Sequence, residues 1–363
     1  MPILCALMPS LDQPQTKKLS ALSHALLTWY DGNARSLPWR ISPSDRRHGI
    51  IPDPYRVWLS EVMLQQTTVP AVRDFFQRFT DRWPSVHDLA AAEEGQVMAE
   101  WAGLGYYARA RNLHACAKKV AGELDGVFPK SAAELQTLPG IGPYTAAAIS
   151  AICHDERVGV LDGNVERVLA RFHALSHPVR DLKPELREAL TQTVPERAGD
   201  YAQALMDLGA TICAPRAAFC DRCPLLPGCR AAKADPLDFP VRPEKKPRPS
   251  RFGHVFVMRD MDGRVKTGTR PRRGLLGGMH EFPGSDWTEG AEPGPQFPVE
   301  GHWKQAGKVH HVFTHFALTL TVWRLDLERR ETGPDWVDEE RLGDLALPSL
   351  FRKVAVAAGL EIR

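Results

Sequence analysis

Four cysteines in one short segment have the residue type and the spacing of a metal site. Cys213, Cys220, Cys223 and Cys229 follow the pattern C-x6-C-x2-C-x5-C within 17 residues. Thiolates are soft ligands that bind iron–sulfur clusters or zinc. A zinc module usually presents two short-spaced cysteine pairs, and this segment has one. A loop wrapped so tightly favours a bulky [4Fe–4S] cluster, with zinc or four unconnected buried thiols as the alternatives.

Two carboxylates stand in apolar stretches and could act as a pair. Glu61 lies between Leu59 and Val62, where partial desolvation would raise its pKa and suit it to general acid catalysis. Asp162 directly precedes an expected helix. The simpler interpretations are a surface glutamate for Glu61 and a helix N-cap for Asp162.

A glycine-rich hairpin is the third feature with chemical meaning. Gly140 and Gly142 permit close backbone approach, and Pro143 suits the first turn of a following helix. The free N–H groups at such a helix start form an anion site that fits a DNA phosphate. A plain corner between two helices is the alternative interpretation.

These residues must be positioned by a mainly helical domain. Apolar residues with a 3.6-residue period predict helices near residues 54–69, 71–79, 93–101, 107–121, 131–138, 143–153, 164–174, 184–194 and 199–209. After a linker rich in Pro, Lys and Arg, short stretches typical of strands follow over 254–258, 265–268 and 312–323. The sequence therefore predicts a mostly α domain followed by an α+β domain.

The expected boundaries give four parts. Residues 1–18 form a frayed leader, 19–235 the helical domain, 236–251 the linker and 252–363 the second domain. Within the helical domain we expect one subdomain over about 50–155. A second subdomain, which carries the cysteines, is expected from 19–49 together with 156–235.

Composition narrows the class of protein. The chain has 363 residues, 43% hydrophobic and 25% charged, which excludes a disordered or fibrous protein. The formal net charge is +2, so any nucleic-acid binding must rely on local clusters and backbone donors. The absence of a long apolar run predicts no membrane span, and the odd count of seven cysteines favours a reducing cytoplasm. We expect a cytoplasmic monomer.

Taken in order, the motifs resemble one family. They are Leu37-Pro-Trp-Arg40, Trp58-Leu-Ser-Glu-Val-Met-Leu-Gln-Gln-Thr67, Gly103-Leu-Gly-Tyr-Tyr-Ala-Arg109, the glycine hairpin, Asp162-Gly-Asn-Val and the cysteine segment. This order resembles the MutY family of adenine DNA glycosylases, within the endonuclease III superfamily of helix–hairpin–helix repair enzymes. The resemblance runs from about residue 19 to 363. It implies hydrolysis of the N-glycosidic bond of adenine mispaired with 8-oxoguanine or guanine in duplex DNA.

The same resemblance assigns roles to single residues. Glu61 would protonate adenine N7, and Asp162 would stabilise the oxocarbenium-like sugar, with Tyr144 and Asn164 in support. Superfamily members that nick DNA carry a lysine at the position of Tyr144, so we expect little or no AP-lyase activity. The remaining implied roles are wedging into the duplex by Gln66 and Tyr106, phosphate binding by the hairpin with Gly140 and Gly142, and a [4Fe–4S] cluster on the four cysteines.

The second domain resembles the Nudix fold without its hydrolase signature. Gly274-Leu-Leu-Gly-Gly-Met-His-Glu-Phe-Pro283 is similar to a Nudix segment, but no R-E-x-x-E-E-x-G run follows. In the MutY family this domain reads 8-oxoguanine through a Phe-Ser-His turn. Here the turn would be Phe313, Thr314 and His315, in which threonine keeps the hydroxyl and adds a methyl group.

Two other functions are compatible with some of these motifs. A glycosylase of the same fold could remove thymine or uracil, although the Nudix-like domain and Leu37-Pro-Trp-Arg40 speak against it. A cluster-bearing DNA-binding module without chemistry would require Glu61 and Asp162 to be structural.

Overall fold

The computed structural model describes residues 13–242, 247–271 and 274–362, and its chain divides into two compact units. One unit contains the described residues up to Ala92 together with those from Asn112 to the linker. The other contains Glu93–Arg111 and the described residues from the linker onward. Among the helices of the described residues, none is long and apolar enough to cross a membrane. The expected boundaries kept Glu93–Arg111 in the helical domain, and α8 (Ala108–Glu123) does run through Asn112 without a break.

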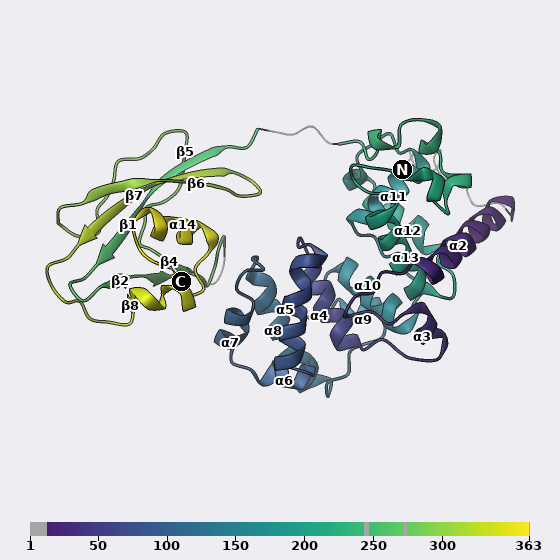
Figure 1. Cartoon of the computed structure of the whole chain (residues 1–363), viewed down its shortest axis with the longest axis horizontal. Helices are drawn as coiled ribbons and strands as arrows, with labels where there is room; N and C mark the ends of the chain where they lie inside the picture. Colours follow the sequence, from purple (N-terminus) through teal and green to yellow (C-terminus); the bar gives the residue numbers. More distant parts are fainter. Residues whose placement is uncertain (1–12, 243–246, 272–273, 363) are drawn as a thin grey trace. The chain divides into compact units, whose positions relative to one another are not determined.

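The first unit is a bundle of helices (Figure 1). Its α-helices, besides the part of α8 from Asn112 on, are α2 (Gln13–Asn33), α3 (Pro43–Arg47), α4 (Pro54–Leu64), α5 (Val69–Arg82), α6 (Val86–Ala91), α9 (Ala132–Leu135), α10 (Pro143–His154), α11 (Gly163–His173), α12 (Lys183–Thr191) and α13 (Ala198–Thr211). Helix α10 contacts α4 and α13, and α13 contacts α2 and α11. Helices α4, α10 and α13 are buried along most of their length, because their sequences are apolar on nearly every face.

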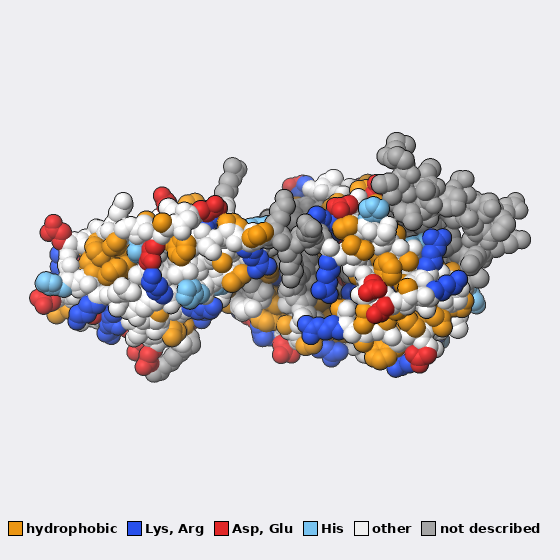
Figure 2. Space-filling view, turned by 90° about the horizontal axis from the view of Figure 1, so that it is seen from above, with side chains coloured by type: hydrophobic (Ala, Val, Ile, Leu, Met, Phe, Trp, Pro, Cys, Tyr) orange, Lys and Arg blue, Asp and Glu red, His pale blue; other side chains and the backbone are white. Residues whose placement is uncertain are grey.

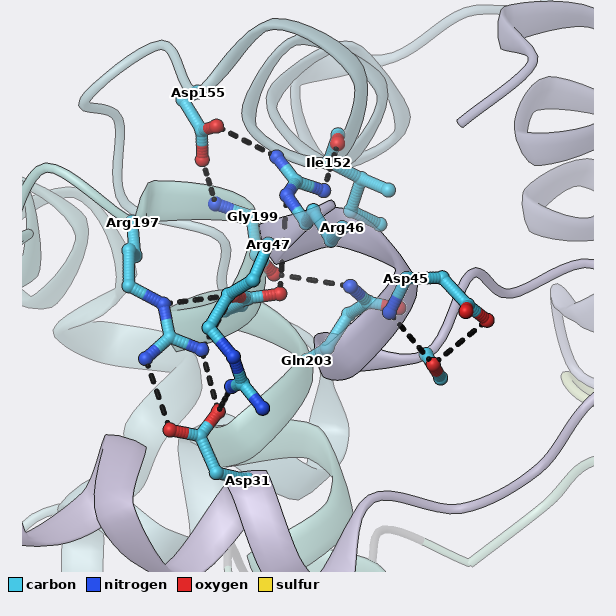
Figure 3. A network of polar contacts seen from close by, with 11 residues as sticks. Asp31, Asp45, Arg46, Arg47, Ile152, Asp155, Arg197, Gly199 and Gln203 are labelled. Atoms are coloured by element: carbon cyan, nitrogen blue, oxygen red, sulfur yellow. Dashed lines mark hydrogen bonds and ion pairs between the residues drawn. The ribbon is translucent and has the colours of Figure 1, made fainter. Parts of the chain in front are cut away.

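A polar network joins four of these helices (Figure 3). Arg46, near the end of α3, donates to the carbonyl of Ile152 at 2.6 Å and to Asp155 Oδ2 at 2.7 Å. Asp155 ends α10 in the left-handed conformation, and its other carboxylate oxygen accepts from the Gly199 amide at 2.9 Å. Arg197 then links Asp31 of α2 to α13. The ends of α2, α3, α10 and α13 are thereby fixed to one another.

The second unit contains a twisted sheet backed by one helix (Figure 1). The strands are β1 (Ser250–Arg259), β2 (Arg264–Lys266), β5 (Thr288–Glu289), β6 (Lys304–Val312), β7 (Ala317–Asp326) and β8 (Trp336–Asp338). They follow the order β6-β7-β1-β2-β8, with β5 paired to β1; among the described strand pairs of this sheet, β1 with β7 is parallel and the others are antiparallel. Helix α14 (Ser349–Ala357) packs Leu350 and Phe351 into the sheet's core. A separate pair joins β3 (Gly268–Thr269) and β4 (His280–Glu281). This unit also includes α7 (Glu94–Glu100).

Three expectations require correction. The strand expected over 312–323 is interrupted, because residues 313–316 form a turn between β6 and β7. The apolar alternation across this turn hides it from the sequence pattern. Residues 13–18 of the expected leader form the first turns of α2, where Pro14 costs little because first-turn amides have no helical partner. Residues 1–12 lie outside the described part. Helices α3 and α6 were not predicted, since each is short.

Charged side chains are distributed in small groups on the face shown in Figure 2. Lys and Arg side chains there are interspersed with acidic and hydrophobic ones. This distribution agrees with the nearly balanced formal charge of the whole chain.

Candidate active site and cysteine loop

Glu61 is a buried carboxylic acid in the helical unit. It lies on α4, where Asp53 caps the helix start with its side chain and Pro54 occupies the first turn. Only 6% of Glu61 is exposed. The pKa of Glu61 is raised to about 7, chiefly by burial. The hydrogen bond from Tyr144 and the charge of Arg40 lower this pKa, and the charge of Asp162 raises it. The simpler interpretation of a surface glutamate is wrong.

Tyr144 connects Glu61 to the glycine hairpin. Its hydroxyl donates to Glu61 Oε2 at 2.7 Å, across 83 residues of sequence. Burial and the two nearby carboxylates hold the pKa of Tyr144 well above its usual value. The phenol therefore stays protonated and serves as a hydrogen-bond donor to the acid.

The two hairpin glycines differ in what the fold demands of them. Gly140 has a φ of +73°, and a Cβ there would lie 2.7 Å from Cβ of Asn112. Gly142, the N-cap of α10, has an ordinary φ of −85°, and a Cβ there would meet nothing within 4 Å. Contact with Asn112 and the positive φ thus explain why position 140 requires glycine. At position 142 neither reason applies, because the space beside Gly142 is open.

Asp162 is a helix cap and a member of the same cluster of polar groups. One carboxylate oxygen accepts from the Val165 amide at 2.7 Å, so the simpler N-cap interpretation is confirmed. The other oxygen accepts from Asn164 Nδ2 at 3.0 Å. Because Asp162 acts electrostatically on both Glu61 and Tyr144, the structure brings these predicted residues together.

A buried ion pair that sequence reasoning did not single out lies near this cluster. Asp207 on α13 has no exposed side-chain surface and accepts from Arg40 at 2.8 Å and from both the amide and the guanidinium of Arg35. The positive charge of Arg40 lowers the pKa of Glu61. Arg40 was noted only as the end of a motif. An acidic residue inside the apolar α13 was the available signal for Asp207.

Gln66 and Tyr106, the two predicted wedge residues, share an unusual backbone conformation. Their φ angles are +57° and +51°, in the left-handed region that residues other than glycine rarely adopt. Tyr106 is also 53% exposed, which is high for an aromatic side chain. Such strain is retained mainly at functional positions. Gln66 belongs to the first unit and Tyr106 to the second.

The four predicted cysteines surround one cavity beside α11. Cys213, Cys220, Cys223 and Cys229 all line it. They lie after α13, on a segment shaped by the short turns η2 (Cys220–Arg222) and η3 (Leu226–Gly228). Cys116 and Cys153, by contrast, are separately buried thiols. The four cysteines thus share one cavity, which neither Cys116 nor Cys153 lines.

The four cysteines are a donor set of the kind that soft metals bind. Their thiols line one cavity, and thiolates are ligands of iron–sulfur clusters and of zinc. Arg171, which is 2% exposed, donates to Cys213 Sγ at 3.3 Å and to the Ala214 carbonyl at 2.9 Å. These two hydrogen bonds fix the position of Cys213 at the wall of the cavity.

Arg167 connects the carboxylate cluster with the cysteine segment. Its Nη2 donates to Asn164 Oδ1 at 2.9 Å, and its Nε donates to the Cys213 carbonyl at 2.8 Å. Asn164 in turn holds Asp162. Helix α11 thus fixes both groups from one element.

In the second unit, the predicted Phe313, Thr314 and His315 lie at the tip between β6 and β7. Thr314 and His315 are exposed, whereas Phe313 is half-buried against the core. A cavity of about 500 Å³ in this unit is lined by Arg270, Glu281 and Trp287 among others, and the three turn residues are not part of its lining.

Comparisons with known proteins define the class. Residues 59–196 match the HhH-GPD superfamily of base excision DNA repair proteins, and residues 254–357 match the NUDIX domain. A solved structure of a thermostable thymine-DNA glycosylase is 26% identical, with a TM-score of 0.53, and covers 61% of this chain and 99% of that chain. The fold and the site thus define a helix–hairpin–helix DNA glycosylase with a Nudix-like second domain.

The curated relatives identify the family within that class. The adenine DNA glycosylase of Homo sapiens is 33% identical over 407 residues, which are 93% of this chain and 74% of that protein. That of Buchnera aphidicola subsp. Schizaphis graminum (strain Sg) is 30% identical over 353 residues, 92% of this chain and 97% of that protein. The chain belongs to the adenine DNA glycosylase family. It is an enzyme of base excision repair, and the predicted family and fold class are confirmed.

Proposed function

We propose that this enzyme hydrolyses the N-glycosidic bond of adenine mispaired with 8-oxoguanine or guanine in duplex DNA, without cutting the strand. One observation carries the proposal. Glu61 is buried beside Asp162, with a pKa raised to about 7 and a hydrogen bond from Tyr144. A carboxylic acid in this state holds a proton near neutral pH and can deliver it to a leaving group.

The two carboxylates divide the work as in other glycosidic cleavages. Glu61 protonates adenine N7, so that the base departs as a neutral leaving group, and then activates a water molecule. Asp162 faces the positive charge that develops on the sugar and stabilises it. Asn164 and the Val165 amide hold Asp162 in place, which supports this role. Tyr144 orients Glu61, and no lysine stands at its position to attack the sugar.

The substrate adenine must leave the base stack before Glu61 can reach it. We assign Gln66 and Tyr106 to the gap that it leaves, as their left-handed backbone conformations and the exposure of Tyr106 suggest. A DNA phosphate would bind at the start of α10, where open space beside Gly142 admits it. Thr314 and His315 would read the 8-oxoguanine that stays in the opposite strand.

The four cysteines would hold a [4Fe–4S] cluster. Such a cluster keeps its loop in one conformation when bound, and the base-removal steps do not pass through it. The loop, which includes Arg216 and Arg222, would contact the DNA backbone. We also propose a cytoplasmic monomer, a helical domain over 19–235 and a lesion-recognition domain over 252–363.

Single-turnover assays on labelled duplexes test the proposal. The duplexes carry A opposite 8-oxoguanine, A opposite G, A opposite T, and T opposite G, and each reaction is read with and without alkali. We expect cutting only after alkali, fastest for A opposite 8-oxoguanine. Cutting without alkali would contradict the monofunctional assignment. Preferential loss of thymine opposite G, or no release from any duplex, would contradict the assignment of the target.

A further inference from the structure

The turn between β6 and β7 is anchored at both ends by aromatic side chains. The Phe313 amide donates to the Phe316 carbonyl at 2.9 Å and closes the turn. The two rings lie 4.9 Å apart. Thr314 and His315, the residues between them, are exposed. The direction in which these two side chains point therefore depends on where the two rings are held.

Trp287 contacts both anchoring rings. It stacks on Phe313 with ring centroids 5.8 Å apart and planes at 24°, and it lies 6.1 Å from Phe316. Trp287 belongs to neither β6 nor β7, but to the segment before β5. It is the group from outside the hairpin that spans both ends of the turn. His311 packs against Phe313 as well, from within β6.

The path of the chain around β1 leaves room for this indole. The Phe256 amide donates to the Pro283 carbonyl at 2.7 Å, and Phe252 pairs with Thr288. Residues 283–288 therefore follow the edge of β1. A Cβ on Gly253 would lie only 3.0 Å from Cδ1 of Trp287. The absence of a side chain at position 253 lets the indole lie over the strand.

Two arginines fix the other sides of the aromatic group. The Arg270 guanidinium lies 5.3 Å from the centroid of Trp287 and is held by an ion pair with Glu281. The Arg251 guanidinium lies 4.5 Å from the centroid of Phe316 and pairs with Glu289 at 3.0 Å. Both cations are thus positioned by carboxylates and lie against the rings. The Trp287 indole is thus held between the two phenylalanine rings of the turn and the guanidinium of Arg270.

We propose that Trp287 is a positioning residue for lesion recognition: by holding Phe313 and Phe316, it fixes the β6–β7 turn and so sets the preference for 8-oxoguanine over guanine. This inference rests on the proposed function, in which Thr314 and His315 of that turn read the lesion. Trp287 itself does not touch the DNA. Its effect falls on the ratio of the two rates rather than on the cleavage chemistry.

The test compares single-turnover rates on A opposite 8-oxoguanine and A opposite G for Trp287→Leu, Trp287→Phe and the wild type. Loss of the stack in Trp287→Leu lowers the ratio of the two rates about tenfold, which corresponds to ~1.4 kcal/mol. The rate on A opposite G stays unchanged. Trp287→Phe keeps an aromatic face and restores most of the ratio. Trp303→Leu is the matched control, because Trp303 packs on Phe297 and Phe256 and not on the turn; its ratio stays at the wild-type value.

The outcomes separate this inference from the proposed function. His315→Ala tests the reading turn directly: a lowered ratio there with an unchanged ratio in Trp287→Leu overturns the role of Trp287 alone. An unchanged ratio in both His315→Ala and Thr314→Ala, in an enzyme that still removes adenine, contradicts reading by the turn. Equal losses on both duplexes in Trp287→Leu also overturn the positioning role. Should Trp287→Leu not fold, Gly253→Ala, whose Cβ would lie 3.0 Å from Cδ1 of Trp287 and so push against the indole, serves in its place and should lower the ratio; an unchanged ratio would count against the inference.

Discussion

The carboxylate cluster (Glu61 and Asp162 with Tyr144 and Asn164) and the β6–β7 turn differ in how far their functional side chains are exposed to solvent. Glu61 is almost completely removed from water, and its pKa is changed by that removal. Thr314 and His315 are exposed, and only the phenylalanines beside them are packed. Proton transfer needs a group whose acidity the protein controls, whereas recognition of a base needs groups that solvent and DNA can reach. The proton-transfer group is therefore buried, whereas the residues proposed to read the base are exposed and held by packed neighbours.

The means of support differ in the same way. Hydrogen bonds and buried charge hold the carboxylate cluster, through Tyr144, Asn164 and the Arg40–Asp207 pair. Aromatic contacts hold the turn, through Trp287. Changes at the first site should therefore alter rate, stability and pH dependence together. Changes at the second should alter discrimination alone.

The largest expected effect is loss of base release in Glu61→Gln. The amide keeps the shape of the side chain but cannot donate the proton of a carboxylic acid, so the single-turnover rate on A opposite 8-oxoguanine should fall about 10²–10⁴-fold. Binding of the same duplex, measured by fluorescence anisotropy, should persist. Glu166→Gln, at a half-buried residue of α11 outside the cluster, is the control. Normal turnover by the Glu61→Gln variant would show that Glu61 is not the general acid. The burial of Glu61 would then have no link to catalysis.

The next effect concerns stability. In Asp207→Asn, the guanidinium of Arg40, whose side chain is 9% exposed, and that of the half-buried Arg35 lose the compensating charge. Breaking a buried pair in this way costs about 3–5 kcal/mol of the free energy of unfolding. Urea denaturation of the helical domain, followed by far-UV circular dichroism, measures it.

The matched control for this variant is an exposed ion pair of the same unit. Arg180 and Asp181 interact at 3.2 Å with more than half of each side chain exposed. Asp181→Asn should change the free energy of unfolding by about 0–1 kcal/mol. Similar losses in both variants would show that burial of Asp207 adds nothing, contrary to the argument for a charge-supported site.

The sequence predicted the features of the site that depend on local residues, but not the contacts between distant segments. The apolar neighbours of Glu61 predicted its partial desolvation but left a surface position open, and the tight spacing of the cysteines predicted a shared site. The hydrogen bond from Tyr144 joins residues 83 positions apart, and no local pattern encodes it. Asp207 was missed for the same reason, since its partners lie on a distant segment. Long-range pairing of polar groups is fixed by packing, which a single sequence does not display.

The β6–β7 turn shows a second kind of limit. The apolar alternation from Val312 to Trp323 satisfies the pattern of one continuous strand, and no Gly, Pro or Asn interrupts it. The chain nevertheless reverses at 313–316, where the rings of Phe313 and Phe316 pack on Trp287. An aromatic anchor from elsewhere in the chain replaces the usual turn residues. Resemblance to a known family, not periodicity, placed the turn there.

A smaller effect is a change in pH dependence in Tyr144→Phe. Glu61 must be protonated to act, so activity should fall as the pH rises through its pKa of about 7. The hydrogen bond from Tyr144 lowers that pKa by favouring the ionised form. Removal of this hydrogen bond should raise the pKa of Glu61, so the alkaline limb of the pH–rate profile should move to higher pH. On the acid side the rate should change less than about tenfold, because a neutral hydrogen bond contributes about 0.5–1.5 kcal/mol.

The wild-type profile and that of Thr193→Val serve as references for this prediction. Thr193 contacts the hydroxyl of Tyr201, a different buried tyrosine of the same unit, so its loss should not move the limb. A limb that moves to lower pH in Tyr144→Phe would mean that the phenol stabilises the protonated acid instead. The electrostatic argument for the site would then have the wrong sign.

The smallest expected effect distinguishes the hydroxyl of Thr314 from its methyl group. Thr314 is exposed at the tip of the turn, so neither Thr314→Ser nor Thr314→Ala should change the free energy of unfolding by more than about 0.5 kcal/mol. Serine keeps the donor and the acceptor and gains rotamer freedom at χ1, so the ratio of rates on A opposite 8-oxoguanine and A opposite G should change by about twofold or less. Alanine lacks the hydroxyl and should lower that ratio about two- to tenfold, the factor for one hydrogen bond of about 0.5–1.5 kcal/mol. Single-turnover assays on the two duplexes measure both variants. Equal ratios for Ser and Ala would mean that the turn reads the lesion through His315 and the backbone, and that its exposed hydroxyl has no part in the discrimination.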